Sequence, residues 1–300
     1  MAVIETEGLT RRFRRNDAVN GLTLQVPTGS VFALLGPNGA GKTTTIKLLM
    51  NLLRPTRGQA RVLGCDTRSL GVGQRQRIGY VSENQKLPGW MPVAQLLAYC
   101  RPLYPSWDEA FARALQASLG LSPAARIGAM SRGTRVKAAL LAALAFRPDL
   151  VVLDEPFTGL DPVVRDELIR ALLEACAERT ATVFLSSHDI EEVERLADWI
   201  GFIEGGRLLF AEPTASLLTR FRLVEVIANT PPPVPADSRW IVQGSSGRTL
   251  RLIDTAHDAV DGDAKVAALF AGAEVRTAPL SLREIFVALA RRPQAAKETL

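Results

Sequence analysis

A glycine-rich segment at residues 36–44, Gly-Pro-Asn-Gly-Ala-Gly-Lys-Thr-Thr, most constrains what this chain can fold into. The spacing from Gly36 to Thr43, with Gly, four residues and then Gly-Lys-Thr, is that of a phosphate-binding loop. An apolar run over 31–35 precedes it and predicts a buried parallel strand, and a helix-like segment over 44–53 follows. Because a glycine-rich turn that merely starts a helix lacks this full context, the sequence predicts a nucleoside triphosphate site.

The residue types of the loop explain how it would hold phosphate. Glycines let backbone N–H groups point toward an anion, and the N-terminus of the following helix adds positive potential. We expect Lys42 to reach the β- and γ-phosphates and the hydroxyl of Thr43 to bind Mg²⁺. The nucleotide-binding residues expected in this loop are Gly36, Pro37, Asn38, Gly39, Ala40, Gly41, Lys42, Thr43 and Thr44.

Two carboxylates follow an apolar strand candidate over 150–153. Asp154, at the end of the strand, is well placed to hold Mg²⁺ through water, and Glu155 is a candidate general base for the attacking water. An apolar run that ends in Asp-Glu is by itself a weak signal, because strands commonly end at the surface. Its combination with a phosphate-binding loop and with the following segment 156–161 predicts the second half of a nucleotide site.

Length and composition limit the classes of protein to which the chain can belong. The chain has 300 residues, which favours about two domains, and no apolar run approaches the roughly 20 residues of a spanning helix. The N-terminus lacks the layout of a signal peptide, and 3 scattered cysteines predict reduced thiols in the cytosol. The net charge of +5 is compatible with nucleic acid or an anionic membrane, but the basic residues are mixed with 31 acidic ones. A solvated basic face is therefore the expectation, with no nucleic-acid partner.

Apolar patterning predicts two kinds of architecture. Short stretches within residues 1–35 predict antiparallel strands, and the helical period begins at Val93 and runs to Leu119. Later strands and helices alternate, which predicts a parallel sheet covered by helices on both faces. The expected strands are 59–63, 78–81, 150–153 and 182–185, and the expected helices are 134–146, 162–177 and 190–197.

The pattern changes near Arg220. Residues 231–235 read Pro-Pro-Pro-Val-Pro, which predicts a stiff extended connector or loop. Strand candidates at 223–227 and 249–253 and a helix candidate at 282–291 predict a small α+β domain over 221–300.

Over residues 3–220 the chain resembles the ATP-binding subunits of ABC transporters. Asp154-Glu155-Pro156 is similar to the family's second nucleotide motif with its catalytic glutamate, and residues 158–161 are similar to the loop that contacts the other subunit, centred on Asp161. Residues 186–189, Ser-Ser-His-Asp, are similar to the switch segment, in which His188 would contact the γ-phosphate. The resemblance implies an α/β P-loop NTPase domain over 1–220, with a mostly parallel sheet, an antiparallel N-terminal β-subdomain and a helical subdomain at about 86–147.

The resemblance also assigns residues outside the phosphate loop. Phe13 stands where the family has an aromatic that stacks on adenine, although a core role is the alternative, and Val19 would complete the base pocket. Met130-Ser131-Arg132-Gly133-Thr134 replaces the usual Leu-Ser-Gly-Gly-Gln signature, keeping Ser131 and Gly133 for the phosphate of the opposite subunit. Arg132 would add a charge near the phosphates or point to solvent, and the sequence leaves both open.

The loop after 78–81 departs from the family pattern. It reads Ser-Glu-Asn-Gln, so Glu83 takes the place of the usual metal-contacting Gln, and Gln85 is the alternative. The next segment, Leu-Pro-Gly-Trp-Met at 87–91, would either receive a helix of a membrane partner or pack on its own subdomain.

The resemblance implies a cycle that uses ATP and Mg²⁺. Two copies, identical or homologous, would close around two ATP molecules and pull on a membrane permease, and hydrolysis would reopen them. The signature and the C-terminal segment 281–286 are similar to the energising subunits of ABC-2 type exporters. The expected location is cytoplasmic, on the inner face of the membrane through the permease. The alternative is a soluble ABC ATPase that acts on ribosomes or nucleic acid.

Overall fold

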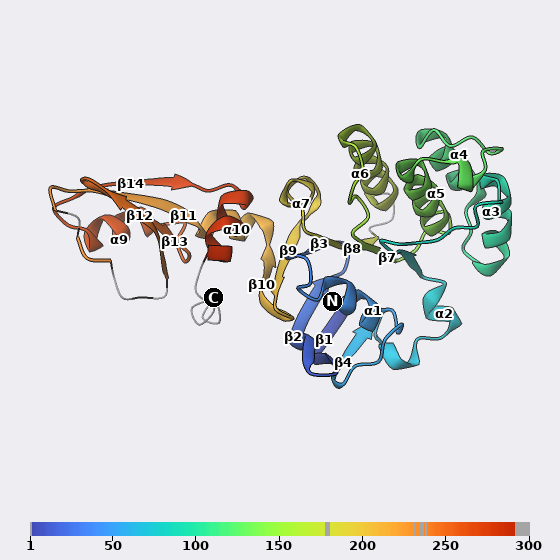
Figure 1. Ribbon diagram of the computed structural model, residues 1–300, viewed down its shortest axis with the longest axis horizontal. Coiled ribbons are helices and arrows are strands. Elements are labelled where there is room, and N and C mark those ends of the chain that lie inside the picture. Colours follow the sequence, from blue (N-terminus) through green and yellow to red (C-terminus); the bar gives the residue numbers. More distant parts are fainter. Residues whose placement is uncertain (1, 178–180, 231, 235–236, 238, 292–300) are drawn as a thin grey trace. The chain divides into compact units, whose positions relative to one another are not determined.

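The computed structural model describes residues 2–177, 181–230, 232–234, 237 and 239–291, and its residue contacts divide the chain into two units. The first unit is Met1–Leu208 and the second is Leu209–Leu300 (Figure 1). The domain boundary expected from the sequence at 220/221 stays a prediction, since the contacts divide the chain earlier. In the described residues no helix combines the length and the hydropathy that a bilayer span requires.

A six-stranded sheet forms the centre of the first unit (Figure 1). Its strands pair in the order β10-β9-β3-β8-β7-β6. The neighbours β9-β3, β3-β8, β8-β7 and β7-β6 are parallel, which confirms the mostly parallel sheet. The strands are β3 (Val31–Leu35), β6 (Ile78–Val81), β7 (Leu150–Asp154), β8 (Thr182–Ser187), β9 (Trp199–Glu204) and β10 (Arg207–Pro213).

Helices cover both faces of this sheet. Figure 1 shows α1 on one side and α5, α6 and α7 on the other, and α1 packs on β7 and β8 while α5 packs on β6. Every residue of β7 and β8 is buried, which explains why both read as continuous apolar or small-residue runs. The helices are α1 (Lys42–Leu49), α5 (Arg132–Leu144), α6 (Pro162–Ala177) and α7 (Ile190–Leu196).

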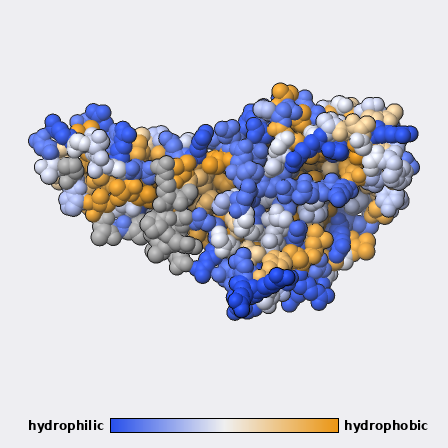
Figure 2. Space-filling model, viewed as in Figure 1, coloured by the Kyte–Doolittle hydropathy of each residue, from blue (hydrophilic) through white to orange (hydrophobic). Residues whose placement is uncertain are grey.

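The N-terminal strands form the predicted antiparallel sheet, with the order β2-β1-β4-β5. Alternate residues of β2 are buried, as expected of a sheet with one face on the core. Figure 2 shows mainly hydrophilic side chains over the lower part of the molecule, where this sheet lies in Figure 1. The strands are β1 (Ala2–Phe13), β2 (Asn16–Pro27), β4 (Arg57–Val62) and β5 (Cys65–Asp66), followed by η1 (Thr67–Ser69) and α2 (Val72–Arg75).

The segment 93–119 is helical, as its period predicted, and it is divided into two helices, α3 and α4. α3 (Val93–Cys100) ends before Pro102, which cannot donate a helical hydrogen bond, and a short 3₁₀ turn follows. Asp108 then caps α4, since its Oδ1 accepts a hydrogen bond of 2.9 Å from the N–H of Phe111. The added elements are η2 (Arg101–Leu103), α4 (Glu109–Ser118) and η3 (Ile127–Ala129).

The second unit, Leu209–Leu300, combines strands and helices, and the domain predicted over 221–300 lies within it. Its antiparallel sheet has the order β12-β13-β11-β14 over a core that includes Val224, Leu252 and Phe270. Of the predicted connector, Pro231 and Pro235 lie outside the described residues. The elements are α8 (Thr214–Arg220), β11 (Arg222–Ile227), β12 (Trp240–Ser246), β13 (Thr249–Asp254), α9 (Gly262–Leu269), β14 (Glu274–Pro279) and α10 (Leu282–Arg291).

The central sheet yields a stability prediction. The rings of Phe184 on β8 and Phe32 on β3 are fully buried and stack with centroids 5.7 Å apart. Phe184→Ala should lower the free energy of unfolding by about 3–5 kcal/mol, because it removes buried apolar surface and leaves a cavity. Urea denaturation followed by tryptophan fluorescence measures this change. Phe184→Leu should cost clearly less, and a loss below about 1 kcal/mol for the alanine variant would contradict this packing.

Candidate active site

The phosphate-binding loop connects the end of β3 to the start of α1, and close packing fixes its glycines. A Cβ on Gly36 would lie 2.1 Å from the carbonyl oxygen of Ile203, and one on Gly41 would lie 2.3 Å from that of Ala18. Gly41 also has a φ of 107°, which side chains rarely tolerate. The loop therefore needs glycine at both positions for reasons of packing and backbone geometry.

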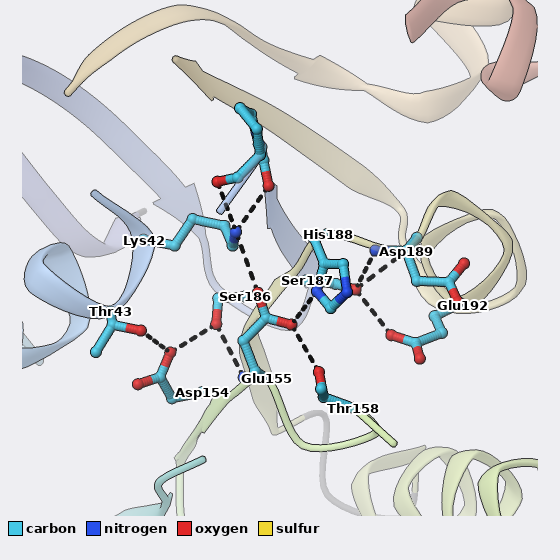
Figure 3. Close-up of polar contacts among 12 residues, drawn as sticks. Lys42, Thr43, Asp154, Glu155, Thr158, Ser186, Ser187, His188, Asp189 and Glu192 are labelled. Atoms are coloured by element: carbon cyan, nitrogen blue, oxygen red, sulfur yellow. Dashed lines mark hydrogen bonds and ion pairs between the residues drawn. The ribbon is translucent and has the colours of Figure 1, made fainter. Parts of the chain in front are cut away.

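Lys42 lies folded over its own loop. Its Nζ donates hydrogen bonds to the carbonyl oxygens of Gly36 (2.7 Å) and Pro37 (3.1 Å), and it lies 3.1 Å from Oε1 of Glu155 (Figure 3). Only 5% of the Lys42 side chain is exposed. A buried ammonium requires such partners, and a carboxylate beside it supplies the counter-charge.

Asp154 lies at the carboxyl end of β7 and is almost completely buried. Its Oδ1 accepts hydrogen bonds from the hydroxyls of Thr43 (2.9 Å) and Ser186 (2.8 Å). The Ser186 oxygen also accepts a hydrogen bond of 3.0 Å from the N–H of Glu155 (Figure 3). In the described chain the two hydrogen-bond partners of Asp154 are thus neutral hydroxyls. Its neighbour Glu155, in contrast, lies beside the ammonium group of Lys42.

Glu155 is the centre of the polar contacts. Its Oε2 lies 2.7 Å from Nδ1 of His188 and accepts a hydrogen bond of 3.0 Å from the Thr158 hydroxyl (Figure 3). Burial pushes the pKa of Glu155 up, but the hydrogen bond with His188 and the charge of Lys42 outweigh it, so the pKa lies below its ordinary value. The backbone φ of Glu155 is 50°, a strained region that is typical of functional sites.

These side chains surround a cavity of about 410 Å³. Lys42 and His188 contribute its basic groups, and Glu83 and Glu155 its acidic ones. Ala18, Thr158 and Ser186 are the residues near the cavity that sequence reasoning did not single out. The lining residues are Ala18, Asn38, Gly39, Gly41, Lys42, Thr43, Thr44, Glu83, Glu155, Thr158 and His188.

The register of the sheet is the signal that could have found Ser186. Asp154 and Ser186 are paired residues on the neighbouring parallel strands β7 and β8, so their side chains emerge at the same edge. The segment 186–189 was singled out for His188 alone. Knowing the strand order would have added the serine hydroxyl beside it.

Glu83 and Gln85, the two alternatives for the metal-contacting loop residue, are separated by the structure. Glu83 lines the nucleotide cavity. The Oε1 of Gln85 accepts a hydrogen bond of 3.2 Å from the N–H of Ser82, and its side chain lines a different cavity of about 320 Å³.

The expected base-binding residues lie outside the cavity walls. Phe13 is 41% exposed, and the guanidinium carbon of Arg11 lies 4.6 Å from the centre of its ring. An exposed ring is available for stacking, and the exposure does not fit the alternative that Phe13 is a core residue. Val19 is fully buried, and its neighbour Ala18 lines the cavity instead.

The signature residues Ser131 and Gly133 and the loop residue Asp161 are not among the residues that line the cavity. Exposed Ser131 caps α5, because its Oγ accepts a hydrogen bond of 3.2 Å from the N–H of Thr134. Gly133 packs on Val164, where a Cβ would lie 2.8 Å from Cγ1. Asp161 begins α6, accepting a hydrogen bond of 3.0 Å from the Val164 N–H.

Arg132 does not line the nucleotide cavity of its own chain, and its side chain lies against another loop of the protein. A Cβ placed on Gly159 would lie 3.1 Å from its Nη1, so the guanidinium rests against the 158–161 loop. Since Gly159 has a φ of 70° and no side chain, it leaves room for this arginine. The loop and the helix α5 are therefore in direct contact within one chain.

The fold and the site together define a class. A glycine-rich loop between β3 and α1, an Asp-Glu pair at the end of β7 and a histidine after β8 meet at the carboxyl edge of a parallel sheet. Ligands of such sheets bind at this edge, and this set of groups is that of P-loop nucleoside triphosphatases.

Comparison with known proteins narrows the class to one family. A family model described as ABC transporter matches residues 19–158. The chain is 39% identical over 225 residues to the daunorubicin/doxorubicin resistance ATP-binding protein DrrA of Streptomyces peucetius, over 71% of this chain and 66% of that protein. It is 33% identical over 305 residues to Nod factor export ATP-binding protein I of Burkholderia pseudomallei (strain 1710b), over 97% of this chain and 98% of that protein.

Solved structures of ATP-binding cassettes have the same fold as the first unit of this chain. An ATP-binding subunit of an ABC transporter superposes with a TM-score of 0.65 at 26% identity, over 72% of this chain and 91% of that one. A dimeric ATP-binding cassette with bound ADP and Pi superposes with a TM-score of 0.62 at 20% identity, over 70% and 98%, which shows the fold alone. The chain belongs to the ABC transporter family, as an ATP-binding subunit with ATPase activity.

The lowered pKa of Glu155 predicts a pH-dependent contribution to stability. The ionised carboxylate is favoured in the folded state, so this contribution is present above the ordinary pKa of 4.5 and is lost as the pH falls through the lower folded value. Wild-type protein should therefore exceed Glu155→Gln in free energy of unfolding by more at pH 7 than at about pH 3. Urea titrations at both pH values measure the difference.

The matched control is Glu194→Gln, which changes an exposed glutamate on α7. Its difference from the wild type should stay within about 0.5 kcal/mol across the same range, because surface substitutions rarely exceed that. An advantage over Glu155→Gln that grows toward acid would contradict the ion pairs described for Glu155.

Proposed function

We propose that this chain hydrolyses ATP to power a separate membrane permease, and that the transporter is an exporter. The observation that carries the proposal is the Glu155 carboxylate, held between Lys42 and His188 beside a phosphate-binding loop. The names of two relatives refer to daunorubicin/doxorubicin resistance and to Nod factor export, which supports the direction of transport.

In this proposal the loop residues from Gly36 to Thr44 bind the phosphates. Their backbone N–H groups lie at the N-terminus of α1, which favours an anion. On nucleotide binding, Lys42 exchanges its contacts with Gly36 and Pro37 for phosphate oxygens. The ring of Phe13 stacks on the adenine, and buried Val19 supports the strand that carries the pocket residue Ala18.

The donor set beside the loop fits Mg²⁺. Asp154 is a buried carboxylate whose partners in the described chain are hydroxyls, and Thr43 adds a second hard oxygen. Thr43 and Asp154 would hold the ion; of the two loop residues, Glu83 lines the same cavity and could contribute a carboxylate, whereas Gln85 lines another cavity. Bound with the nucleotide, Mg²⁺ supplies positive charge to the phosphate oxygens.

Two side chains of the cavity carry the chemistry. Glu155 accepts the proton of the attacking water, and its hydrogen bond with His188 orients both groups. His188, which lines the same cavity, would contact the γ-phosphate. The strained backbone at Glu155 fixes the carboxylate at the edge of the cavity before the nucleotide binds.

Each site is completed by a second ATPase subunit, identical or homologous. Ser131, Gly133 and Asp161 lie outside the cavity of their own chain, and Ser131 is exposed at the N-terminus of α5. A helix N-terminus with a serine hydroxyl suits the γ-phosphate of a facing copy. The dimeric state of a solved cassette with the same fold is consistent with this arrangement.

The permease contact lies on the helical segment. Trp90 and Tyr99 are 65% and 63% exposed, and Leu87 lines the apolar cavity of about 320 Å³. Large exposed aromatic residues are typical of an interaction surface. This contact would hold the protein on the cytoplasmic side of the membrane.

The function is tested with two variants of the full chain. Lys42→Ala should abolish detectable ATP binding or hydrolysis, because the phosphates lose their cation. Glu155→Gln should bind ATP with wild-type affinity and hydrolyse it at least about a hundredfold more slowly, and should accumulate as an ATP-bound dimer. Phosphate release and size-exclusion chromatography with Mg²⁺ and ATP measure these effects, and unchanged turnover of Glu155→Gln would remove this glutamate from the role of base.

Transport itself requires the permease. Vesicles that contain both proteins should move a substrate only with wild-type ATPase, and Glu155→Gln should stop movement while the complex stays assembled. The wild-type chain could hydrolyse ATP while no membrane protein of the transporter class couples that hydrolysis to transport. This outcome would leave the ATPase assignment intact and refute the permease assignment.

Ser186 offers a separate prediction about Mg²⁺. Ser186→Ala removes a hydrogen bond that orients Asp154, so the Mg²⁺ concentration for half-maximal hydrolysis should rise about 10- to 100-fold, while binding of metal-free ATP stays unchanged. Titration of hydrolysis with Mg²⁺ measures the shift. Ser118→Ala on α4, which removes a hydroxyl bonded to a backbone carbonyl, is the control and should behave like the wild type.

A further inference from the structure

Hydrogen bonds and ion pairs among four polar side chains hold the loop that carries His188. These side chains belong to Arg165, Ser187, Asp189 and Glu192. The Oγ of Ser187 donates a hydrogen bond of 2.8 Å to Oε2 of Glu192 and accepts one of 2.9 Å from the Asp189 N–H (Figure 3). Nη1 of Arg165 lies 3.1 Å from Oδ2 of Asp189 and 3.6 Å from Oε1 of Glu192. The residues on both sides of His188 are therefore tied to one arginine.

This arginine belongs to the first turn of α6. The Arg165 N–H donates a hydrogen bond of 3.0 Å to the carbonyl oxygen of Asp161, the last residue of the 158–161 loop. Its side chain is only 19% exposed. A displacement of the loop that rotates the start of α6 must therefore move the guanidinium that holds Asp189 and Glu192.

The contacts form a closed ring between two chain segments. At one end Thr158 and His188 both bond to the carboxylate of Glu155, and at the other end Arg165 joins Asp189. Segments 155–165 and 187–192 are thus clamped at two points. Such a ring leaves His188 little freedom to move independently of the 158–161 loop.

Charge makes Arg165 necessary to this arrangement. Glu192 is 5% exposed, and burial raises its pKa, as do the nearby carboxylates of Asp189 and Glu155, while Ser187 and Arg165 lower it. Arg165 is the cationic side chain within ion-pair distance of both Asp189 and Glu192 in the described part of the chain. Without it, the buried carboxylate of Glu192 and the partly exposed one of Asp189 would lie near each other without a cation, which is costly for the buried group.

We propose that Arg165 is a positioning residue: by holding Asp189 and Glu192 it keeps His188 bonded to Glu155 and couples the histidine to the 158–161 loop. The inference rests on the proposed function, in which that loop meets the second subunit. In the described part of the chain the Arg165 guanidinium pairs with Asp189 and Glu192 and does not line the nucleotide cavity, so its effect passes through the orientation of His188.

The test compares Arg165→Met with a matched control in the full chain. Arg195→Met removes an exposed ion pair of 2.5 Å with Asp166 that also joins α7 to α6 but lies away from the loop. Arg165→Met should lower kcat about tenfold or more and leave the Kd for ATP within about twofold. Arg195→Met should leave both unchanged, and Arg165→Lys, which keeps the charge, should recover part of kcat.

A double variant separates positioning from simple loss of structure. Glu192→Gln keeps a hydrogen-bond acceptor for Ser187 but removes the charge that Arg165 offsets. Arg165→Met with Glu192→Gln should therefore be at least about threefold more active than Arg165→Met alone, a non-additivity expected only of coupled residues. Thermal unfolding followed by circular dichroism verifies that each variant is folded.

Histidine spectroscopy provides a readout that does not depend on hydrolysis. The chain has 2 histidines, so labelled imidazoles give two signals, and His257 in the second unit is an internal reference. Arg165→Met should shift the signal of His188 and leave that of His257 unchanged.

Three results would overturn the inference: wild-type kcat in Arg165→Met, an equal loss in Arg195→Met, or an unshifted His188 signal. Failure of the wild-type chain to bind ATP would instead refute the proposed function, while the spectroscopic result would still decide the role of Arg165.

Discussion

The carboxylate of Glu155 is the interaction on which the site depends. Glu155 is buried and has a strained backbone. Its carboxylate contacts Lys42, Thr158 and His188 at the same time. These partners come from the phosphate loop, the segment after β7 and the end of β8, which are far apart in sequence. One buried charge can join them because parallel strands place their carboxyl ends at a common edge, and because each partner satisfies part of its hydrogen-bonding capacity.

The two adjacent carboxylates have different surroundings, and this difference divides their tasks in our proposal. Glu155 lies against a lysine and a histidine, whereas Asp154 lies against the hydroxyls of Thr43 and Ser186. A buried carboxylate among neutral groups gains more from a bound cation than one that already has an ion pair. Asp154 is thus suited to the metal and Glu155 to the proton of the attacking water.

Much of the fold could be predicted from local signals. The glycine-rich loop, the apolar runs of β7 and β8 and the helix Pro162–Ala177 depend on short-range preferences, and each lies where the pattern placed it, within a few residues. The helical period over 93–119 is found as two helices, α3 and α4, because Pro102 and the cap at Asp108 divide the segment. Periodicity alone does not register a missing backbone donor.

The site residues that sequence reasoning missed are those whose role depends on neighbours in space. Ala18 reaches the cavity because β2 passes beside the loop, and Ser186 meets Asp154 because β8 is inserted between β3 and β7. The difference between Glu83 and Gln85 is likewise a matter of which way a turn closes, since Gln85 bonds back to Ser82. None of these spatial contacts leaves a recognisable pattern in the amino-acid sequence.

The sequence by itself determined the chemistry: a loop able to cradle phosphate, two acids after a buried strand and a histidine after another, because those functions need particular residue types at particular spacings. Only the tertiary structure decided which groups form ion pairs, which line the cavity and which lie outside it. The reason is that hydrogen bonds and ion pairs act over a few ångströms, and strand order brings distant residues within that range.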